Sequence, residues 1–359
     1  MDEIIISHTS KANKKHEFFS KNTPVLIMLS GGSDSVALTY IMHELVKRGE
    51  IAEIAALHVN HKLRGRDAEE DAAFVEGLCK HLEIPLFMAE VDVASIAKER
   101  GENIEAVGRH ERYALANDAL QSLCNHAGTP IDQGRIATAH TLNDRAENFY
   151  MRSVVGTGPF GLAGISHKSG NIIRPVLDIE RCELQKFIKK VARPYSGNIE
   201  EFWRTDATNE ETDRFRTYIR NAVMPLLEEI NPHFLQNLRR SMDNIADTYK
   251  YVNKDVEAAF KTCTERQDEE SVLLKPEICK CDKYIIKQVV YKILLTLLGQ
   301  DSRVDGSTID KILDAIDTNN KIVSGYVVNI QGNLMVSANK HGVLIEPAEK
   351  YRARRKRLK

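Results

Sequence analysis

A run of five apolar residues, 25–29, leads directly into the short polar loop Ser30-Gly31-Gly32-Ser33-Asp34-Ser35, and a second apolar run begins at residue 36. The first run is typical of a strand buried on both faces, and the second of the start of a helix. A loop between a strand and a helix N-terminus binds anions, because backbone N–H groups and the positive end of the helix dipole meet there. The two glycines let the backbone approach a phosphate closely. This segment therefore predicts an α/β fold with a phosphate-binding loop.

The same loop offers ligands for a metal ion. Asp34 lies between the hydroxyl groups of Ser33 and Ser35, so its carboxylate could hold Mg²⁺ against phosphate oxygens. The loop lacks the Lys-Ser/Thr pair that closes the common G-x-x-x-x-G-K-[ST] phosphate loop. A simple helix-capping turn is the alternative interpretation, because Ser, Asp and Gly are all frequent at helix N-termini.

Strands and helices alternate through the first half of the chain. Further strands are predicted at residues 51–59, 86–93, 135–140 and 171–177, and helices at 67–82, 103–123, 144–154 and 179–191. This alternation predicts a parallel sheet with helices on both faces. Ligands of such sheets bind beyond the carboxyl ends of the strands, which is where the polar loop falls.

The pattern changes beyond this sheet region. Helices are predicted at residues 221–230, 232–260, 282–298 and 308–318, with an acidic polar break at 267–271, and period-two alternation predicts a small β unit at 321–346. We therefore expect three parts: a sheet domain at 1–220, a helical region at 221–320, and the β unit with a basic tail at 321–359. The tail itself, 351–359, is interpreted either as a disordered solubilising end or as an arm that contacts nucleic-acid phosphates.

The composition excludes several classes of protein. Lys and Arg number 50 against 51 Asp and Glu, a net charge of −1, so binding to nucleic acid would need local basic patches. The six scattered cysteines fit free thiols in a reducing cytoplasm rather than a disulfide framework. Residues 1–22 lack the apolar core of a signal peptide, and the most apolar segment, 284–298, is short and contains two lysines. We expect a cytoplasmic protein with no membrane span.

The segment His58-Val59-Asn60-His61-Lys62-Leu63-Arg64-Gly65 ends the second predicted strand. It places imidazoles and cations near the expected phosphate site, where Arg64 could neutralise phosphate charge. Two alternatives stay open, a metal pair of His58 and His61 and a plain polar loop.

The predicted helix at 103–123 carries charged side chains on one face. Glu105, Arg109 and Arg112 follow spacings of four and three residues, which brings all three to the same side. An ordinary ion pair between Glu105 and Arg109 explains part of this pattern, and contact with a phosphate is the functional interpretation.

Two carboxylates follow the fourth predicted strand. Asp144 and Glu147 lie three residues apart, so they share one helix face just beyond His140. Beside a phosphate site they could bind an ammonium group, orient a nucleophile or take its proton. Solvation at the surface is the alternative.

Taken in order, these motifs resemble those of the tRNA(Ile)-lysidine synthetase family, a branch of the PP-loop ATP pyrophosphatases. The resemblance covers residues 25 to about 225 and rests on the loop and on segments 58–65, 101–113, 137–147, 156–164, 173–175 and 206–209. Val155 and Thr217 depart from the family pattern, which usually has Arg and Asn there. Arg216 and Arg220 keep a basic pair. We expect these departures to affect tRNA contacts more than the ATP chemistry.

The resemblance implies a reaction that uses ATP and Mg²⁺. The enzyme would adenylate the wobble cytidine of CAU-anticodon tRNA(Ile), and free L-lysine would then displace AMP at carbon 2 to give lysidine. The helical region would bind tRNA, and a homodimer is compatible with the resemblance. The residues that it assigns to ATP are Ser30, Gly31, Gly32, Ser33, Asp34, Ser35, His58, Asn60, Arg64 and His140. Those assigned to catalysis are Asp34, Arg109, Arg112, Asp144 and Glu147, with Asp34 and Asp144 as metal ligands.

Three rival functions fit the sequence less well. An ammonia-using amidating ligase on the same fold is one, and the segments 58–65 and 144–147 suit it poorly. A tRNA 2-thiolating enzyme of the same superfamily needs a pair of cysteines near the ATP site, whereas Cys79, Cys124 and Cys182 are isolated. A non-catalytic tRNA- or nucleotide-binding module is disfavoured by the intact loop and by the carboxylates at 144 and 147.

Overall fold

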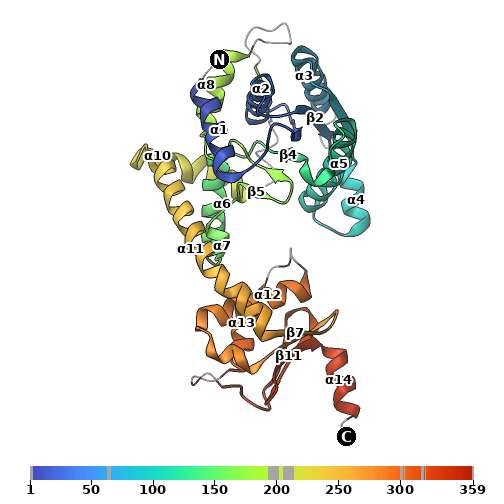
Figure 1. Ribbon diagram of the computed structural model, residues 1–359, viewed down its shortest axis with the longest axis vertical. Helices are drawn as coiled ribbons and strands as arrows, with labels where there is room; N and C mark the ends of the chain where they lie inside the picture. The colour runs from blue at the N-terminus through green and yellow to red at the C-terminus, as the bar shows by residue number, and fades with distance from the viewer. Residues whose placement is uncertain are drawn as a thin grey trace. The chain divides into compact units, whose positions relative to one another are not determined.

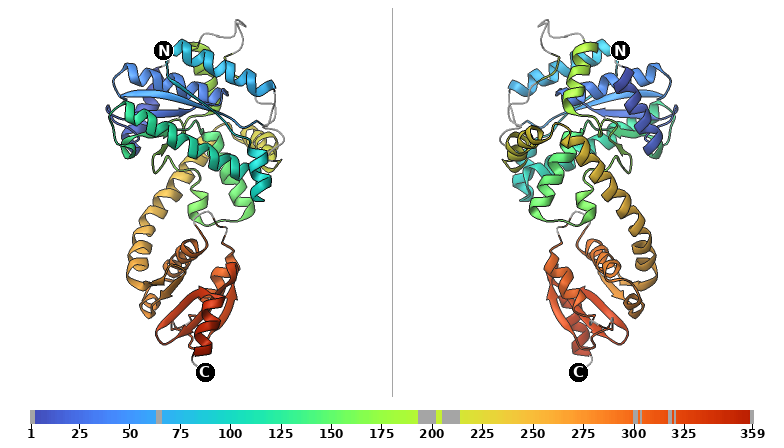
Figure 2. Two further views of the ribbon diagram at one scale, coloured as in Figure 1. Left: turned by 90° about the vertical axis from the view of Figure 1, so that its right-hand side faces the viewer. Right: turned by 90° about the vertical axis from the view of Figure 1, so that its left-hand side faces the viewer.

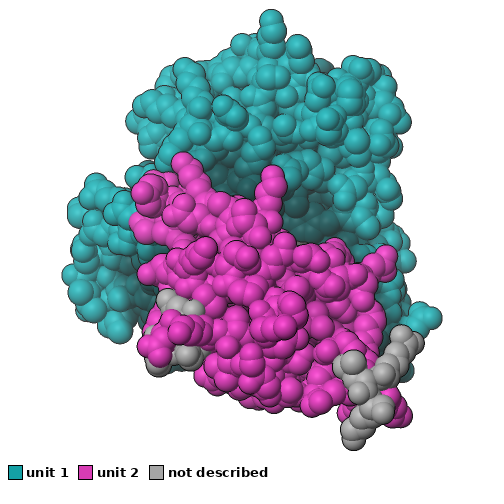
Figure 3. Space-filling view, turned by 60° about the horizontal axis from the view of Figure 1, so that its bottom comes forward, with its two compact units in different colours: residues 1–245 teal, residues 246–359 magenta. Residues whose placement is uncertain are grey.

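The computed structural model describes residues 3–62, 66–192, 202–204, 214–299, 302, 304–316, 319 and 321–357. The chain divides into two compact units, Met1–Ile245 and Ala246–Lys359 (Figure 3). Each is described by itself.

The first unit is built on a six-stranded sheet. Its strands are β1 (Pro24–Met28), β2 (Glu53–Asn60), β3 (Leu86–Glu90), β4 (Arg135–Ala137), β5 (Lys168–Ser169) and β6 (Ile172–Ile173). Their order is β3-β2-β1-β4-β6-β5, and every pair is parallel except β5 with β6. The predicted parallel sheet is thus confirmed. The fifth predicted strand, 171–177, shrinks to β6 because the chain turns at Pro175, and its hairpin partner β5 was not predicted.

Helices cover both faces of this sheet, as predicted (Figures 1 and 2). They are α1 (Glu3–His16), α2 (Ser33–Lys47), α3 (Arg66–Leu82), α4 (Val93–Arg100), α5 (Ile104–His126), α6 (Leu142–Val155), α7 (Pro159–Leu162) and α8 (Arg181–Val191), with one 3-10 turn, η1 (Ile131–Gln133). Successive residues of β1 point to opposite faces. Val25 and Ile27 pack with α1, α2, α3 and α8, whereas Leu26 packs with α5.

Three of these helices, α1, α4 and α7, were not predicted. Residues 1–22 appear only as a polar segment in the sequence, yet Ile5 and Ile6 of α1 are buried in the main core. The strand predicted at 86–93 ends early because the Asp92 side chain accepts a hydrogen bond from the backbone N–H of Ser95 at 3.0 Å, which starts α4.

The first unit ends in helices that pack on α6. These are α9 (Arg214–Tyr218), the π-helical turn η3 (Ile219–Val223), α10 (Met224–Ile230) and the first part of α11 (Phe234–Cys263). Leu142 and Ala146 of α6 meet Ile219, Met224 and Met242 in a separate apolar cluster. This packing carries residues 214–224 back to the carboxyl edge of the sheet.

The second unit combines the rest of α11 with a five-stranded antiparallel sheet. Its further elements are β7 (Thr264–Asp268), β8 (Ser271–Leu274), η4 (Pro276–Lys280), α12 (Lys283–Leu298), α13 (Gly306–Leu313), β9 (Val327–Ile330), η5 (Gln331–Asn333), β10 (Leu334–Asn339), β11 (Gly342–Pro347) and α14 (Ala348–Arg357). The strand order is β7-β8-β11-β10-β9. The predicted polar break at 267–271 contains the turn of the β7–β8 hairpin, whose two strands were not predicted.

The basic tail is ordered over most of its length. Residues 348–357 form α14, so the expectation of a disordered end is wrong for them. Arg354 anchors this helix by hydrogen bonds from its guanidinium to Glu346 Oε1 at 2.6 Å and Ser337 Oγ at 3.1 Å. None of the described helices has the length and apolar character needed to cross a membrane.

Candidate functional site

The phosphate-loop prediction corresponds to a tight turn between β1 and α2. Gly31 has φ +90°, which residues with a Cβ rarely adopt, and its carbonyl accepts a hydrogen bond from Arg204 N at 2.9 Å. The hydroxyl of Ser35 donates to the carbonyl of Gly32 at 2.9 Å and lies 3.1 Å from that of Ser30. These contacts fix the loop, and the first N–H groups of α2 have no intrahelical acceptors. The turn therefore leaves backbone N–H groups available that could bind an anion.

The two carboxylates of α6 are buried beside this loop. Asp144 caps its own helix, because its Oδ2 accepts hydrogen bonds from the N–H and hydroxyl of Thr141 at 2.7 and 2.8 Å. Asp144 is 7% exposed and Glu147 1%. Solvation at the surface, the alternative left open by the sequence, is therefore wrong for this pair.

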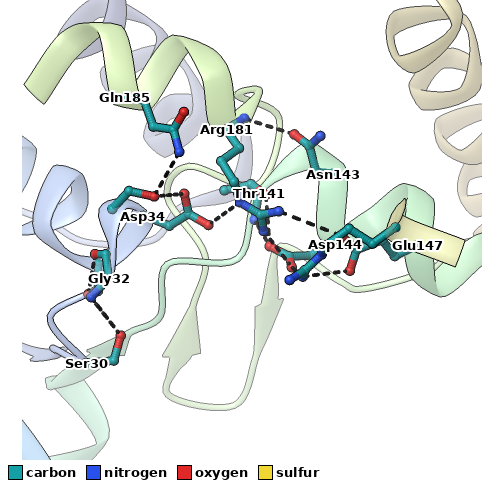
Figure 4. A network of polar contacts seen from close by, with 12 residues as sticks. Ser30, Gly32, Asp34, Thr141, Asn143, Asp144, Glu147, Arg181 and Gln185 are labelled. Carbon is teal, nitrogen blue, oxygen red and sulfur yellow. Dashed lines mark hydrogen bonds and ion pairs between the residues drawn. The ribbon is translucent and has the colours of Figure 1, made fainter. Parts of the chain in front are cut away.

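Three arginines pair with these carboxylates, and one of them, Arg181, also pairs with Asp34 (Figure 4). Arg181 donates from Nε to Asp34 Oδ2 at 2.8 Å and from Nη2 to Asp144 Oδ1 at 3.2 Å. The other two arginines come from α9 and η3. Arg216 contacts Glu147 Oε2 at 2.7 Å and Asp144 Oδ1 at 2.8 Å, and Arg220 contacts Glu147 Oε1 at 2.8 Å. Three positive and three negative side chains thus form one network, called the carboxylate–arginine network below.

Burial and these ion pairs set the protonation of the network. Burial raises the pKa of Asp34, although Arg181 opposes that shift. For Asp144 burial also favours the neutral acid, but Arg181 and Arg216 outweigh it and leave the pKa of Asp144 lowered. Burial lowers the pKa of His140 to about 4, so its imidazole is neutral near pH 7. Its Nδ1 is hydrogen-bonded to Thr138 Oγ1 at 2.9 Å.

The segment at the end of β2 and just beyond it has a different arrangement from the one expected. His58 is buried, and its Nδ1 lies 2.9 Å from the carbonyl oxygen of Leu29. It therefore braces the backbone just before the loop. His61 lies against Arg112, whose Nη2 is 3.1 Å from His61 Nε2, so a metal pair of the two histidines is not formed. Asn60 accepts a hydrogen bond from Lys62 N at 2.9 Å, and Arg64 falls outside the described residues.

The long helix α5 carries the two arginines predicted to take part in catalysis. The guanidinium of Arg109 lies over the ring of Tyr113, 5.2 Å from its centroid, and Arg112 reaches His61. Arg109 also lowers the pKa of His140 through its charge. Both arginines therefore belong to the same edge of the sheet as the network, without direct contact to its carboxylates among the described hydrogen bonds.

Sequence reasoning missed Arg181, and it recognised Arg216 and Arg220 only as a basic pair of the family pattern, without a partner. In the structure these two arginines pair with Asp144 and Glu147. The available signal for Arg181 was its place at the start of a helix after the last parallel strand, where ligand-binding loops of such sheets gather. Nothing in the local pattern distinguished it from an ordinary helix residue.

A second polar cluster contains His16, His167 and Asp178, whose ligand atoms all lie within 4.8 Å of one another. The two imidazole rings are stacked, with centroids 3.9 Å apart and planes at 9°, so their in-plane lone pairs do not converge on one point. His167 Nε2 and Arg145 Nη1 instead contact the two oxygens of Asp178, at 2.9 and 2.7 Å. This arrangement is explained by packing of α1 against the sheet unit.

Curated relatives match most of this chain. A relative from Clostridium perfringens named tRNA(Ile)-lysidine synthase is 32% identical over 332 residues, which cover 92% of this chain and 66% of the relative. A relative of the same name from Caldanaerobacter subterraneus is 30% identical, covering 89% of this chain and 65% of its own length. The chain therefore spans about two thirds of the length of these curated relatives.

The fold comparison supports the sheet architecture. The solved structure of the U34-tRNA thiolase NcsA from Methanococcus maripaludis aligns with a TM-score of 0.52 and 18% identity, covering 68% of this chain and 81% of that one. That likeness shows the fold alone. The family model described as the PP-loop domain matches residues 2–227, which include the loop, α6 and all three arginines of the network. By this match the chain belongs to the PP-loop domain family.

Proposed function

We propose that this protein is a tRNA(Ile)-lysidine synthase, which uses ATP to join lysine to carbon 2 of the wobble cytidine in CAU-anticodon tRNA(Ile). The observation that carries the proposal is the carboxylate–arginine network, which Arg181 links directly to the loop of residues 30–35. Its relatives at about 30% identity bear that name over most of this chain. A PP-loop domain implies ATP binding, and the buried carboxylates suit a second substrate that carries an ammonium group.

The first step would be adenylation of the cytidine. The loop from Ser30 to Ser35 would hold the ATP phosphates while the cytidine O2 attacks the α-phosphorus, and pyrophosphate leaves with the electrons of the broken P–O bond. Arg181 is placed to contact these phosphates, because its guanidinium lies beside the loop. Asp34 and Asp144 fit Mg²⁺, since both already share one cationic partner. A bound Mg²⁺ would offset the negative charge of the phosphates.

The second step would be displacement of AMP by lysine. The ε-amine attacks carbon 2, the C–O bond to AMP breaks, and the amine loses a proton. Glu147 is the better candidate to hold this ammonium group and take its proton. Its close partners are Arg216 and Arg220, whereas Arg181, which pairs with Asp34 of the loop, is 3.8 Å away. Asp144 is tied to the loop through Arg181 and belongs with the ATP half of the site.

Incorporation of radiolabelled lysine tests the proposal. The substrate is an unmodified CAU-anticodon tRNA(Ile) transcript, with and without ATP, and the control is a methionine tRNA with the same anticodon. ATP-dependent labelling of the isoleucine tRNA alone is expected. AMP release with tRNA but without labelling would refute lysine as the nucleophile. Neither signal would refute the enzyme assignment and favour a binding module.

A further inference from the structure

Arg181 occupies a central place in the carboxylate–arginine network. It is the first residue of α8, and its backbone N–H donates to Asn143 Oδ1 at 2.9 Å, which fixes the start of that helix against α6. Its guanidinium then spans two elements, with Nε on Asp34 of the loop and Nη2 on Asp144 of α6 (Figure 4). Residues that bridge in this way hold two carboxylates together that would otherwise repel each other.

The three arginines do not all pair with the same carboxylates. Arg216 and Arg220 both contact Glu147, and both also pair with Asp144 Oδ1, at 2.8 Å from Arg216 and at 3.9 Å from Arg220. Asp34, by contrast, has Arg181 as its ion-pair partner. Removing Arg181 would therefore leave the pair Asp34–Asp144 without its shared cation, whereas removing Arg220 would leave that bridge intact.

A metal ion bound to Asp34 and Asp144 would need the position that Arg181 now holds. Two cations placed within a few ångströms in a half-buried site repel strongly, because the effective dielectric constant there is well below that of water. A guanidinium also binds phosphate as well as carboxylate, through the same forked geometry. The arrival of ATP phosphates at the loop would offer Arg181 a second acidic partner beside the first.

We propose that Arg181 is a built-in counter-cation for the Asp34–Asp144 pair, which keeps a divalent cation out of the pair until nucleotide phosphates draw the guanidinium away. The inference rests on the proposed use of ATP and deepens it, since it makes metal binding depend on nucleotide binding. Arg181 thereby becomes a nucleotide-binding residue of the loop, although it lies 147 positions further along the chain.

Binding of Mn²⁺ to the nucleotide-free full chain, followed by electron paramagnetic resonance, tests this proposal without tRNA, lysine or turnover. The Arg181→Gln variant should bind Mn²⁺ about tenfold more tightly than wild type. Arg220→Gln is the matched control, because it removes the same charge from the same network but does not touch Asp34. Equal tightening in both variants, or none in Arg181→Gln, would overturn the proposal.

Two further variants guard against misfolding and against unrelated Mn²⁺ sites. The double variant Asp34→Asn with Arg181→Gln should lose the added Mn²⁺ affinity, and retention of that affinity would overturn the assignment of the site. Arg181→Lys keeps the charge and should stay close to wild type in Mn²⁺ binding; tightening equal to that of Arg181→Gln would contradict a counter-cation role. Melting temperatures identify any variant that fails to fold.

Nucleotide affinity provides the second arm. With Mg²⁺ saturating, Arg181→Gln should bind a non-hydrolysable ATP analogue about tenfold more weakly than wild type. Unchanged affinity would overturn the transfer of Arg181 to the phosphates. Because neither arm measures lysine incorporation, failure of the proposed tRNA reaction would leave both results interpretable.

Discussion

The Nε atom of Arg216 lies 2.7 Å from Oε2 of Glu147, a carboxylate that is 1% exposed. This contact joins α9 to α6, and with Arg220 it gives the Glu147 carboxylate two cationic partners. An incoming ammonium group must therefore share or replace an arginine at this carboxylate. The arrangement makes Glu147 the residue whose charge can be tested most directly.

Replacing Glu147 by Gln should separate the two steps of the proposed reaction. The amide keeps the shape of the side chain but can neither hold an ammonium ion by charge nor take its proton. We expect lysine incorporation to fall about 100-fold or more, while ATP-dependent release of pyrophosphate with tRNA falls much less. Glu228→Gln, on the exposed face of α10, is the control and should retain both activities. Equal losses in both steps would argue that Glu147 acts in adenylation.

Gly31 should be required for nucleotide binding because of its backbone conformation, and not because a larger side chain would clash with its neighbours. An added Cβ would meet its nearest neighbours at 3.6–3.7 Å, so the penalty of Gly31→Ala comes from φ +90° and amounts to about 1–2 kcal/mol. Gly49→Ala carries a similar penalty at φ +69°, at the far end of α2. Both variants should lose similar stability in urea unfolding. Only Gly31→Ala should lose affinity for ATP, as measured by calorimetry, and equal ATP affinity would contradict the loop assignment.

His140 should make the first unit less stable at acidic pH. Its pKa is lowered from 6.5 to about 4, so between these values the unfolded chain binds a proton that the folded chain does not. The free energy of unfolding therefore falls as pH falls through this window, and His140 contributes about 3 kcal/mol of that loss. Urea unfolding at pH 7.5 and pH 4 should show a smaller fall for His140→Gln than for wild type. Identical pH profiles would show that His140 titrates normally.

The exposed cations of α14 should contribute to tRNA affinity through charge alone. Arg352, Arg355 and Lys356 are exposed, unlike Arg354, which pairs with Glu346. Replacing the three by Gln should weaken tRNA binding at low salt and reduce the slope of log K against log salt by about 2. Filter binding across a salt series measures this slope. The same replacement of Lys11, Lys14 and Lys15, exposed on α1, is the comparison, and an equal effect there would exclude a specific role for α14.

The sequence predicted those elements whose formation depends on neighbouring residues, and it missed those that depend on distant pairing partners. The β1–loop–α2 segment was recognised because an apolar run, two glycines and an aspartate lie in consecutive positions. The strands β5, β7 and β8 were not, since they are short or polar and are held by their pairing partners. Likewise, an imidazole such as that of His58 can face a ligand or brace a backbone carbonyl, and only the register of β2 decides between them.

The candidate site was predictable only in part, for a related reason. Asp144 and Glu147 stand close in sequence, so their shared helix face could be inferred. Arg181 reaches Asp34 across 147 positions, and Arg216 reaches Glu147 across 69. Such contacts depend on strand order and helix packing, which no local pattern contains.

The boundary between the two units falls within helix α11. Its first part supplies Phe234, Leu235 and Met242 to the cluster around α6, and its last part supplies Val256, Ala259 and Cys263 to the core of the second unit. Dissection at residue 245 would therefore cut an unbroken 30-residue helix and strip both fragments of hydrogen bonds across the cut. A fragment expressed from either side of residue 245 would therefore begin or end within a helix rather than at a loop.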